Sequence, residues 1–201
     1  KIGNHKLGKI RNEGFSVSEL KEIAKKFNNA KFINLSERLP ENIREENEAC
    51  VVLIKNGAKL FLQDSNAADK LLEEQLSIEY DKKFYNARMK KTQNNRARYN
   101  IVFGDNNILA SKDYKQGTVI SFSSLPLLNQ FRNKLPDFLG EKAVNLTAEG
   151  NDYFEEASGI GFHGDRERRI VICLSLGKTH TLRCHWRMPS TSRAYGESID
   201  L

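Results

Sequence analysis

Residues 159–177 read GIGFHGDRERRIVICLSLG, and this stretch decides the fold that we expect for the chain. It places a His-Gly-Asp triplet shortly before an apolar run that predicts a buried strand. An imidazole and a carboxylate two residues apart on an extended segment point the same way, so His163 and Asp165 can both reach one divalent ion. The alternative is a turn at a strand end, in which Gly164 takes a positive φ and Asp165 bonds backbone amides.

The N-terminal part of the chain, residues 1–64, predicts a helical extension that contains a β-hairpin. The segment SVSELKEIAKKF at 16–27 carries apolar residues at helical spacing after a serine N-cap, which predicts a short amphipathic helix. Apolar runs lie on both sides of Asn56-Gly57. They predict a hairpin there, because this dipeptide favours the tight turn between two antiparallel strands.

The remaining part, residues 65–201, predicts the main domain. An apolar face from Ala68 to Phe84 predicts a helix, and the basic residues of 82–91 follow at its C-terminal end, where the helix dipole favours cations. Strand-like runs then recur at short intervals, interrupted by one helix at 125–140. This spacing is typical of an antiparallel sandwich or jelly roll, so we expect an α+β fold with a jelly-roll core.

The composition favours a soluble globular protein, since 39% of the 201 residues are hydrophobic and 29% are charged. The longest apolar runs fall far short of the roughly 20 residues that a membrane span requires, so no membrane association is expected. Three widely spaced cysteines form no CxxC pair. Cys173 and Cys184 lie in strand-like runs and predict buried thiols in an intracellular reducing compartment, cytoplasmic or nuclear.

The net charge of +6 is concentrated in residues 81–98, which hold seven basic residues against one acidic residue. A local excess of this kind favours a polyanionic partner and predicts a nucleic-acid contact. Tyr85 and Tyr99 add aromatic rings on which bases can stack. The alternative is a solvated helix face. The predicted backbone contacts are Lys90, Lys91, Arg96 and Arg98.

The flanks of the His-Gly-Asp triplet carry a wider pattern. An Asn-x-Tyr motif at 151–153 precedes it, the triplet extends to His-x-Asp-x-Glu, and the apolar run ends in Ser-Leu-Gly at 175–177. Together these motifs resemble the AlkB-like family of Fe(II)/2-oxoglutarate-dependent dioxygenases, and residues 148–177 look like viral and protist members of that superfamily. The specific resemblance covers about 145–190, and a looser one reaches back to about 68. It implies a double-stranded β-helix, here a partial one.

The resemblance also implies roles for individual residues. His163 and Asp165 match the first two iron ligands, and Asn151 and Tyr153 match the pair that contacts 2-oxoglutarate. Glu167 matches an acidic position that approaches the target base. Arg166 and Arg168 suit phosphate contacts beside the active site, with an exposed turn as the alternative. Ser175-Leu176-Gly177 matches a structural strand motif.

The family also has a second iron-binding histidine and 2-oxoglutarate-binding arginines further along the chain. We expect both to lie beyond Leu201, in a longer protein of which this chain is a part. His180 or His185 is the alternative third ligand, as in a cupin-like metal protein.

The resemblance therefore implies a dioxygenase that uses Fe(II) and 2-oxoglutarate, and the basic stretch favours modified nucleic acid as the substrate that it hydroxylates or dealkylates. Two other functions stay open. One is a 2-oxoglutarate-dependent hydroxylase of protein or of a small molecule. The other is a non-catalytic nucleic-acid-binding module in which the basic stretch does the binding.

Overall fold

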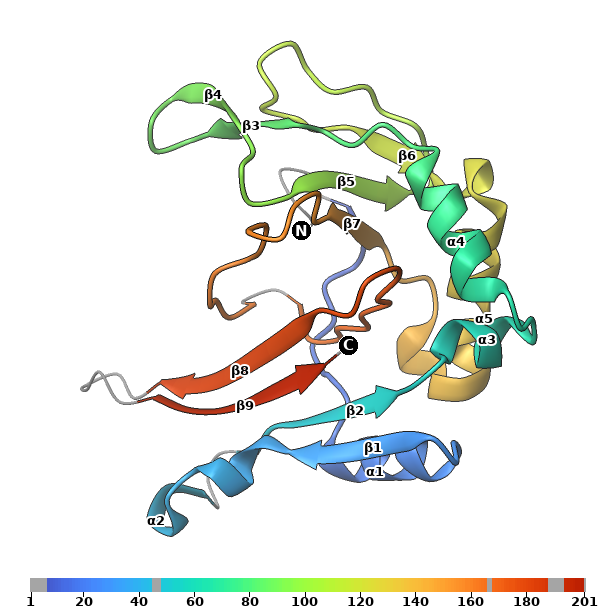
Figure 1. The fold of residues 1–201 in the computed structure, drawn as a ribbon, viewed down its shortest axis with the longest axis vertical. Coiled ribbons are helices and arrows are strands. Elements are labelled where there is room, and N and C mark those ends of the chain that lie inside the picture. Colours follow the sequence, from blue (N-terminus) through green and yellow to red (C-terminus); the bar gives the residue numbers. More distant parts are fainter. Residues whose placement is uncertain (1–6, 45–47, 166–167, 188–193, 201) are drawn as a thin grey trace.

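The computed structural model describes residues 7–44, 48–165, 168–187 and 194–200, the last as a backbone path only. The chain combines helices with several small sheets, which confirms the α+β class (Figure 1). Helices α3, α4 and α5 lie along one side of the molecule, and two antiparallel ribbons, β3–β4 and β8–β9, project on the opposite side. No helix in the described residues has the length and apolar character needed to cross a membrane.

The helices are α1 (Val17–Lys25), α2 (Glu41–Arg44), α3 (Gly57–Leu62), α4 (Ala67–Leu76) and α5 (Pro126–Leu139), with short 3₁₀ turns at Leu35–Arg38, Phe122–Ser124 and Glu141–Ala143. The strands are β1 (Ala30–Asn34), β2 (Cys50–Ile54), β3 (Lys83–Asn86), β4 (Lys91–Asn94), β5 (Tyr99–Gly104), β6 (Val119–Ser121), β7 (Ala148–Asp152), β8 (Thr181–Arg187) and β9 (Ala194–Asp200).

These strands form four separate sheets. Antiparallel pairs are made by β1 with β2, β3 with β4 and β8 with β9. The largest sheet has the order β6-β5-β7, with β5 parallel to β6 and antiparallel to β7. Among the described strands no closed barrel forms, so the observed architecture is a mixed fold with small sheets.

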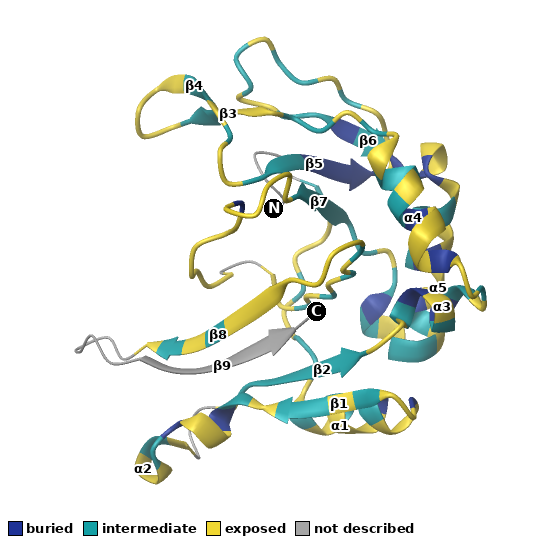
Figure 2. Ribbon diagram, in the orientation of Figure 1, coloured by how far each residue is buried: buried dark blue, intermediate teal, exposed yellow. Residues whose placement is uncertain are grey.

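The main core lies between the helices and is aromatic. Phe61 of α3 is buried, with its ring stacked 4.5 Å from that of Phe138 and 5.4 Å from that of Phe131, and Phe27 adds a tilted ring at 5.8 Å. Figure 2 shows the buried residues on these helices and along β5. A second cluster joins β5 to the turn after β6 through Ile101, Phe103, Phe122 and Leu125.

The helices predicted at 16–27 and 125–140 are confirmed as α1 and α5. Ser16 accepts a hydrogen bond from the Glu19 amide, and the Glu19 carboxylate accepts one from the Ser16 amide, a capping box that fixes the start of α1. In α5, Pro126 takes a first-turn position and Gly140 ends the helix at a φ of +84°.

The hairpin predicted at Asn56-Gly57 is wrong, because the second apolar run forms helix α3. Asn56 takes the left-handed conformation that the hairpin signal requires, yet the chain then turns into a helix. Ala58 and Phe61, three residues apart, face the main core, and their burial outweighs the local turn signal. Strand β2 pairs instead with β1.

The helix predicted to run from Ala68 toward the basic stretch is also wrong in its second half. Helix α4 ends at Leu76, and the residues from Lys83 onward form the hairpin of β3 and β4. The side chain of Asn86 accepts a hydrogen bond from the Met89 amide at 3.0 Å, which closes the turn. The predicted leading basic helix is therefore a basic β-ribbon.

The apolar run at 170–176 forms no strand, contrary to the expectation. Its burial still alternates, with Ile172, Leu174 and Leu176 packed against the main core and the residues between them exposed. Cys173 is one of the exposed residues, so its prediction as a buried thiol is wrong, and Cys184 is half-buried. The run anchors the loop before it to the helical side of the molecule.

Candidate functional site

The polar face of β5 and β7 is the centre of the candidate site. The register pairs Asn100 with Asn151 and Val102 with Glu149, so these side chains share one face of the sheet. Asn100 Nδ2 donates to Glu149 Oε1 at 2.7 Å and to Asn151 Oδ1 at 3.0 Å. Arg98 Nε also donates to Asn151 Oδ1. The predicted cofactor residue Asn151 is thus held by two neighbours on or beside β5.

The opposite face of these strands is apolar and tightly packed. A Cβ added at Gly150 would lie 2.9 Å from Tyr80 Oη and 3.0 Å from both Ile101 Cγ2 and Phe103 Cε2. Burial, with a contribution from the nearby Asp152 carboxylate, raises the pKa of Tyr80 to about 12. Close packing against the apolar face of β7 therefore fixes the strand, and this keeps its polar face in position.

Glu149 connects this face to the loop that carries the His-Gly-Asp triplet. Arg168 Nη2 lies 2.6 Å from Glu149 Oε2, and Arg168 Nη1 lies 3.7 Å from Asp165 Oδ1. A second arginine also contacts Glu149, since Arg98 Nη2 lies 3.7 Å from Glu149 Oε1. The Glu149 side chain is 13% exposed, so water screens these contacts less than it would on an open surface. Asp165 and Asn151 belong to one continuous polar network.

His163 lies on the exposed part of the loop. Its Nδ1 is 2.8 Å from the carbonyl oxygen of Gly161. When Nδ1 carries the proton and donates it to this carbonyl, Nε2 keeps a free lone pair, the arrangement that metal-binding histidines use. The ring is thus oriented by its own loop.

The other predicted cofactor residue, Tyr153, is partly exposed at the end of β7. Burial is the main cause that raises the pKa of its hydroxyl. Its ring lies 5.2 Å from that of His180, and the ring of His185 stacks on Phe162 at 4.0 Å. Both downstream histidines therefore contact aromatic side chains of the loop at 153–162.

Within the described residues, no group of three or more His, Cys, Asp or Glu side chains is placed to hold a metal ion. The structure thus brings neither His180 nor His185 into a three-ligand set with His163 and Asp165. The predicted substrate contacts Arg166 and Glu167 lie outside the described residues. Arg168, predicted as a phosphate contact, instead has its guanidinium on Glu149 and Asp165.

The predicted backbone contacts divide into two groups. Lys90, Lys91 and Arg96 are exposed on or next to the β3–β4 ribbon, and none of them makes an ion pair with another described residue. Arg98 belongs to the Glu149 network. The ring of Tyr99 stacks on Phe154 at 4.1 Å, which joins the start of β5 to the loop after β7.

A cavity of about 410 Å³ opens beside the network, between β3, β5 and the segment 114–118. Its wall combines aromatic rings with hydrogen-bonding groups. The lining includes Tyr85, Arg98, Asn100, Tyr114, Thr118 and Glu149.

The sequence reasoning missed Glu149 and Asn100. A signal for Glu149 was present, since Glu149 and Asn151 are two residues apart on one strand and must point to one side. Nothing local marks Asn100, because its role depends on pairing with a strand about fifty positions away along the chain.

Comparison with known proteins finds a viral relative. Over 208 aligned residues the chain is 32% identical to an uncharacterized protein of Acanthamoeba polyphaga mimivirus, and the alignment covers 100% of this chain and 78% of the relative. No family model matches the chain, and no solved structure matches it.

Proposed function

The chain belongs to the family of this mimivirus protein, and we propose for it the activity of an Fe(II)/2-oxoglutarate-dependent dioxygenase that hydroxylates or dealkylates modified nucleic acid. Two facts support the proposal. The motifs at 151–153 and 163–167 resemble those of the AlkB-like dioxygenases in residue type and spacing. The observation that carries it is the polar network through Arg168 and Glu149, which joins Asp165 to Asn151 across two separate segments.

In this proposal the core is a partial double-stranded β-helix, or jelly roll. The antiparallel pairs β5–β7 and β8–β9 are strand pairs of the kind that such a core requires. The alternating burial of 170–176 supports an additional strand-like segment with one face on the core.

The residues fit two of the three protein ligands of a 2-His-1-carboxylate iron site. His163 offers Nε2, with Nδ1 occupied by the Gly161 carbonyl, and Asp165 offers its carboxylate, held in place by Arg168. The third ligand is a further histidine outside the described residues. Bound Fe(II) and 2-oxoglutarate would supply the oxygen activation needed to hydroxylate a C–H bond.

The side chains of this chain then have separate tasks. Asn151, fixed by Arg98 and Asn100, and the Tyr153 hydroxyl would hold the 2-oxoglutarate carboxylate. The ion pair of Arg168 with Glu149 is already formed and would keep the Asp165 loop against β7 without a conformational search.

The β3–β4 ribbon supports nucleic acid as the substrate class. Its exposed cations make no ion pairs among the described residues, so they are available to phosphates. Replacement of Lys90, Lys91 and Arg96 by Glu is expected to weaken oligonucleotide binding and to flatten its salt dependence.

The proposal is tested by succinate formation in the full-length protein with Fe(II) and 2-oxoglutarate. We expect turnover with alkylated oligonucleotides and its loss in Asp165→Ala, while Asp69→Ala, an exposed aspartate on α4, keeps wild-type activity. Turnover with alkylated or unmodified peptides but not with oligonucleotides would transfer the activity to a protein substrate. Equal succinate formation by wild type and Asp165→Ala would reject the dioxygenase.

A further inference from the structure

Strand β8 presents a row of basic side chains on one face. Arg183, His185 and Arg187 alternate along the strand, so they point to the same side, and all three are exposed. Cys184 and Trp186 lie between them and are half-buried. Trp186 Nε1 donates to the carbonyl of Leu35 at 3.0 Å, which anchors the back of the strand to the N-terminal part. Figure 2 shows that most of β8 is exposed.

Strand β9 places no acidic residue directly across from the three basic residues of this row. The register places Ser198 across from Arg183, Gly196 across from His185 and Ala194 across from Arg187, and none of these residue types carries a charge. One acidic residue, Asp200, stands across from Thr181 at the start of the strand. Among the side chains that the structure describes, neither arginine makes an ion pair. Two arginines against this one acidic residue leave a net positive charge along the row.

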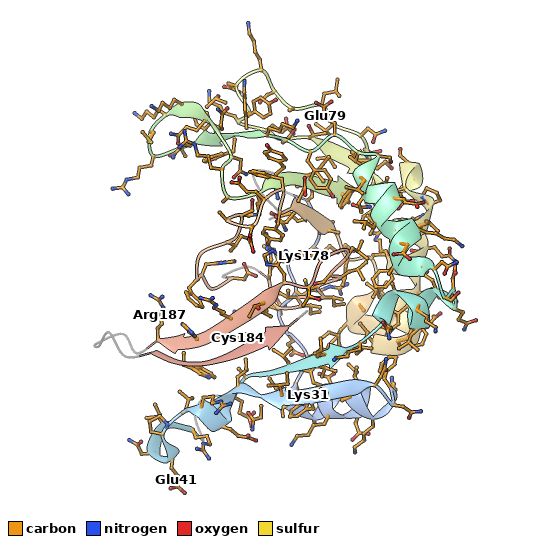
Figure 3. The ribbon with its side chains drawn as sticks, in the orientation of Figure 1. Lys31, Glu41, Glu79, Lys178, Cys184 and Arg187 are labelled. Atoms are coloured by element: carbon orange, nitrogen blue, oxygen red, sulfur yellow. The ribbon has the colours of Figure 1, made fainter. Side chains whose placement is uncertain are left out.

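An aromatic ring from another segment completes this surface. The Phe162 ring stacks on His185 at 4.0 Å, and the Arg187 guanidinium lies 5.5 Å from its centroid. Phe162 is nevertheless 47% exposed, so much of its surface remains accessible to a further ring. Arg187 extends on the side of β8 that faces the loop carrying Phe162 (Figure 3). We call Arg183, His185, Arg187 and Phe162 the β8 strip.

We propose that the β8 strip binds the backbone of single-stranded nucleic acid, with Phe162 as the stacking platform for a base. Same-face side chains on a strand are about 6.7 Å apart, close to the separation of successive phosphates in an extended single strand. A straight cationic row beside an exposed ring is the combination by which proteins hold single strands without sequence preference. Bases paired within a duplex would leave Phe162 without a stacking partner, and an acidic peptide would not need the ring.

The β8 strip is separate from the β3–β4 ribbon, and the two project on the same side of the molecule (Figure 1). The loop that carries His163 contacts β8 through Phe162, and its Gly159 amide donates to the carbonyl of Ala97, in the link that leads from the ribbon to β5, at 2.8 Å. A strand held at both places would pass this loop. Binding to the β8 strip needs no iron, so it holds or fails independently of the proposed dioxygenase activity.

The test measures binding of a fluorescently labelled oligo-dT by fluorescence polarisation, in metal-free buffer and over a range of salt concentrations. Arg183→Gln/Arg187→Gln is compared with Lys55→Gln/Lys59→Gln, which removes the same charge from exposed positions near α3. The arginine pair is expected to weaken binding at least about tenfold at low salt and to reduce the log–log salt slope by about 1.4, from about 0.7 for each phosphate contact. The lysine pair is expected to leave the salt slope at its wild-type value.

A second variant isolates the ring. Phe162→Ala is expected to weaken binding at least about fivefold with an unchanged salt slope, because stacking is lost while the cations remain. Arg183→Lys/Arg187→Lys, which keeps the charge, is expected to retain the slope. Thermal melts of each variant show whether the fold is kept.

Three outcomes would overturn the proposal. If Arg183→Gln/Arg187→Gln binds like the lysine control, phosphates are held elsewhere. If Phe162→Ala binds like wild type, no base stacks on the strip. If polyglutamate of matched charge displaces oligo-dT as well as unlabelled oligo-dT does, the strip recognises acidic polypeptide.

Discussion

The helical side of the molecule and the side that carries His163 are held together by different forces. On the helical side, the buried ring of Phe61 on α3 stacks on the rings of Phe131 and Phe138 on α5 at 5.4 and 4.5 Å. On the His163 side, three segments meet through charged and amide groups centred on Glu149. Apolar burial is strong and non-directional, whereas a polar network gives modest net stability but fixes geometry. The aromatic core should therefore determine the global stability of the fold, and the Glu149 network should determine where the His163 loop lies.

The largest effect is expected on the helical side. Phe61→Ala removes a ring that is 4% exposed and stacked on two others, and this should lower the free energy of unfolding by about 3 to 5 kcal/mol. Urea denaturation followed by circular dichroism measures it. A loss below about 1 kcal/mol would contradict the assignment of the main core to these rings.

A smaller effect is expected where the two sides meet. Gly150→Ala places a methyl group 2.9 Å from Tyr80 Oη and 3.0 Å from Ile101, and such overpacking costs about 1 to 3 kcal/mol. Gly159→Ala is the matched control, because no atom lies within 4 Å of its added Cβ. Equal melting temperatures for the two variants would show that β7 is not packed this tightly against Tyr80.

The network itself should control position more than stability. Glu149→Gln keeps the shape of the side chain but removes its charge from Arg98 and Arg168, and we expect a loss of only about 1 kcal/mol, because Arg168 is partly exposed to water. The rate of amide hydrogen exchange in the peptide that contains Asp165 should rise clearly, because the loop is no longer held by the Glu149 carboxylate. Glu155→Gln, an exposed glutamate on the same loop, should change neither quantity. An unchanged exchange rate in Glu149→Gln would show that the network does not hold the Asp165 loop in place.

The smallest effect is expected at an exposed ion pair away from both sides. The side-chain hydrogen bond from Lys115 is the largest cause that lowers the pKa of Asp113 from 3.8 to about 2. Because the folded-state pKa is the lower one, this contact stabilises the fold above about pH 4 and the stabilisation is lost as the pH falls toward 2. A carboxyl titration by NMR should place the Asp113 midpoint near 2, and a midpoint near 3.8 would show that the pair does not form.

The same division explains what the sequence could predict. Helices α1 and α5 were predicted because their caps and apolar spacing lie within one segment. The prediction of a hairpin at Asn56-Gly57 failed because burial of Phe61 in the aromatic core stabilises the fold more than the local turn preference does. The prediction that the helix continues beyond Leu76 failed because the basic residues form a strand that pairs with a second strand, and the helical spacing of apolar residues gives no sign of this pairing.

The candidate site was predictable only in part. Asn151, Tyr153, His163 and Asp165 stand in a recognisable spacing, and that spacing identified them. The ion pair of Arg168 with Glu149 joins residues nineteen positions apart across a loop, and the exposed apolar residues between them give no periodic signal. Long-range polar contacts are chosen by the folded geometry, so a single sequence does not show them.

Fe(II) affinity of the full-length protein, measured anaerobically with 2-oxoglutarate present, tests the central claim most directly. If His163 and Asp165 bind the metal, Asp165→Ala should weaken binding by more than about 100-fold, beyond the 10- to 100-fold expected for residues that only support a ligand, while Asp69→Ala should bind like wild type. Equal affinities for the wild type and both variants would contradict a metal centre at His163 and Asp165.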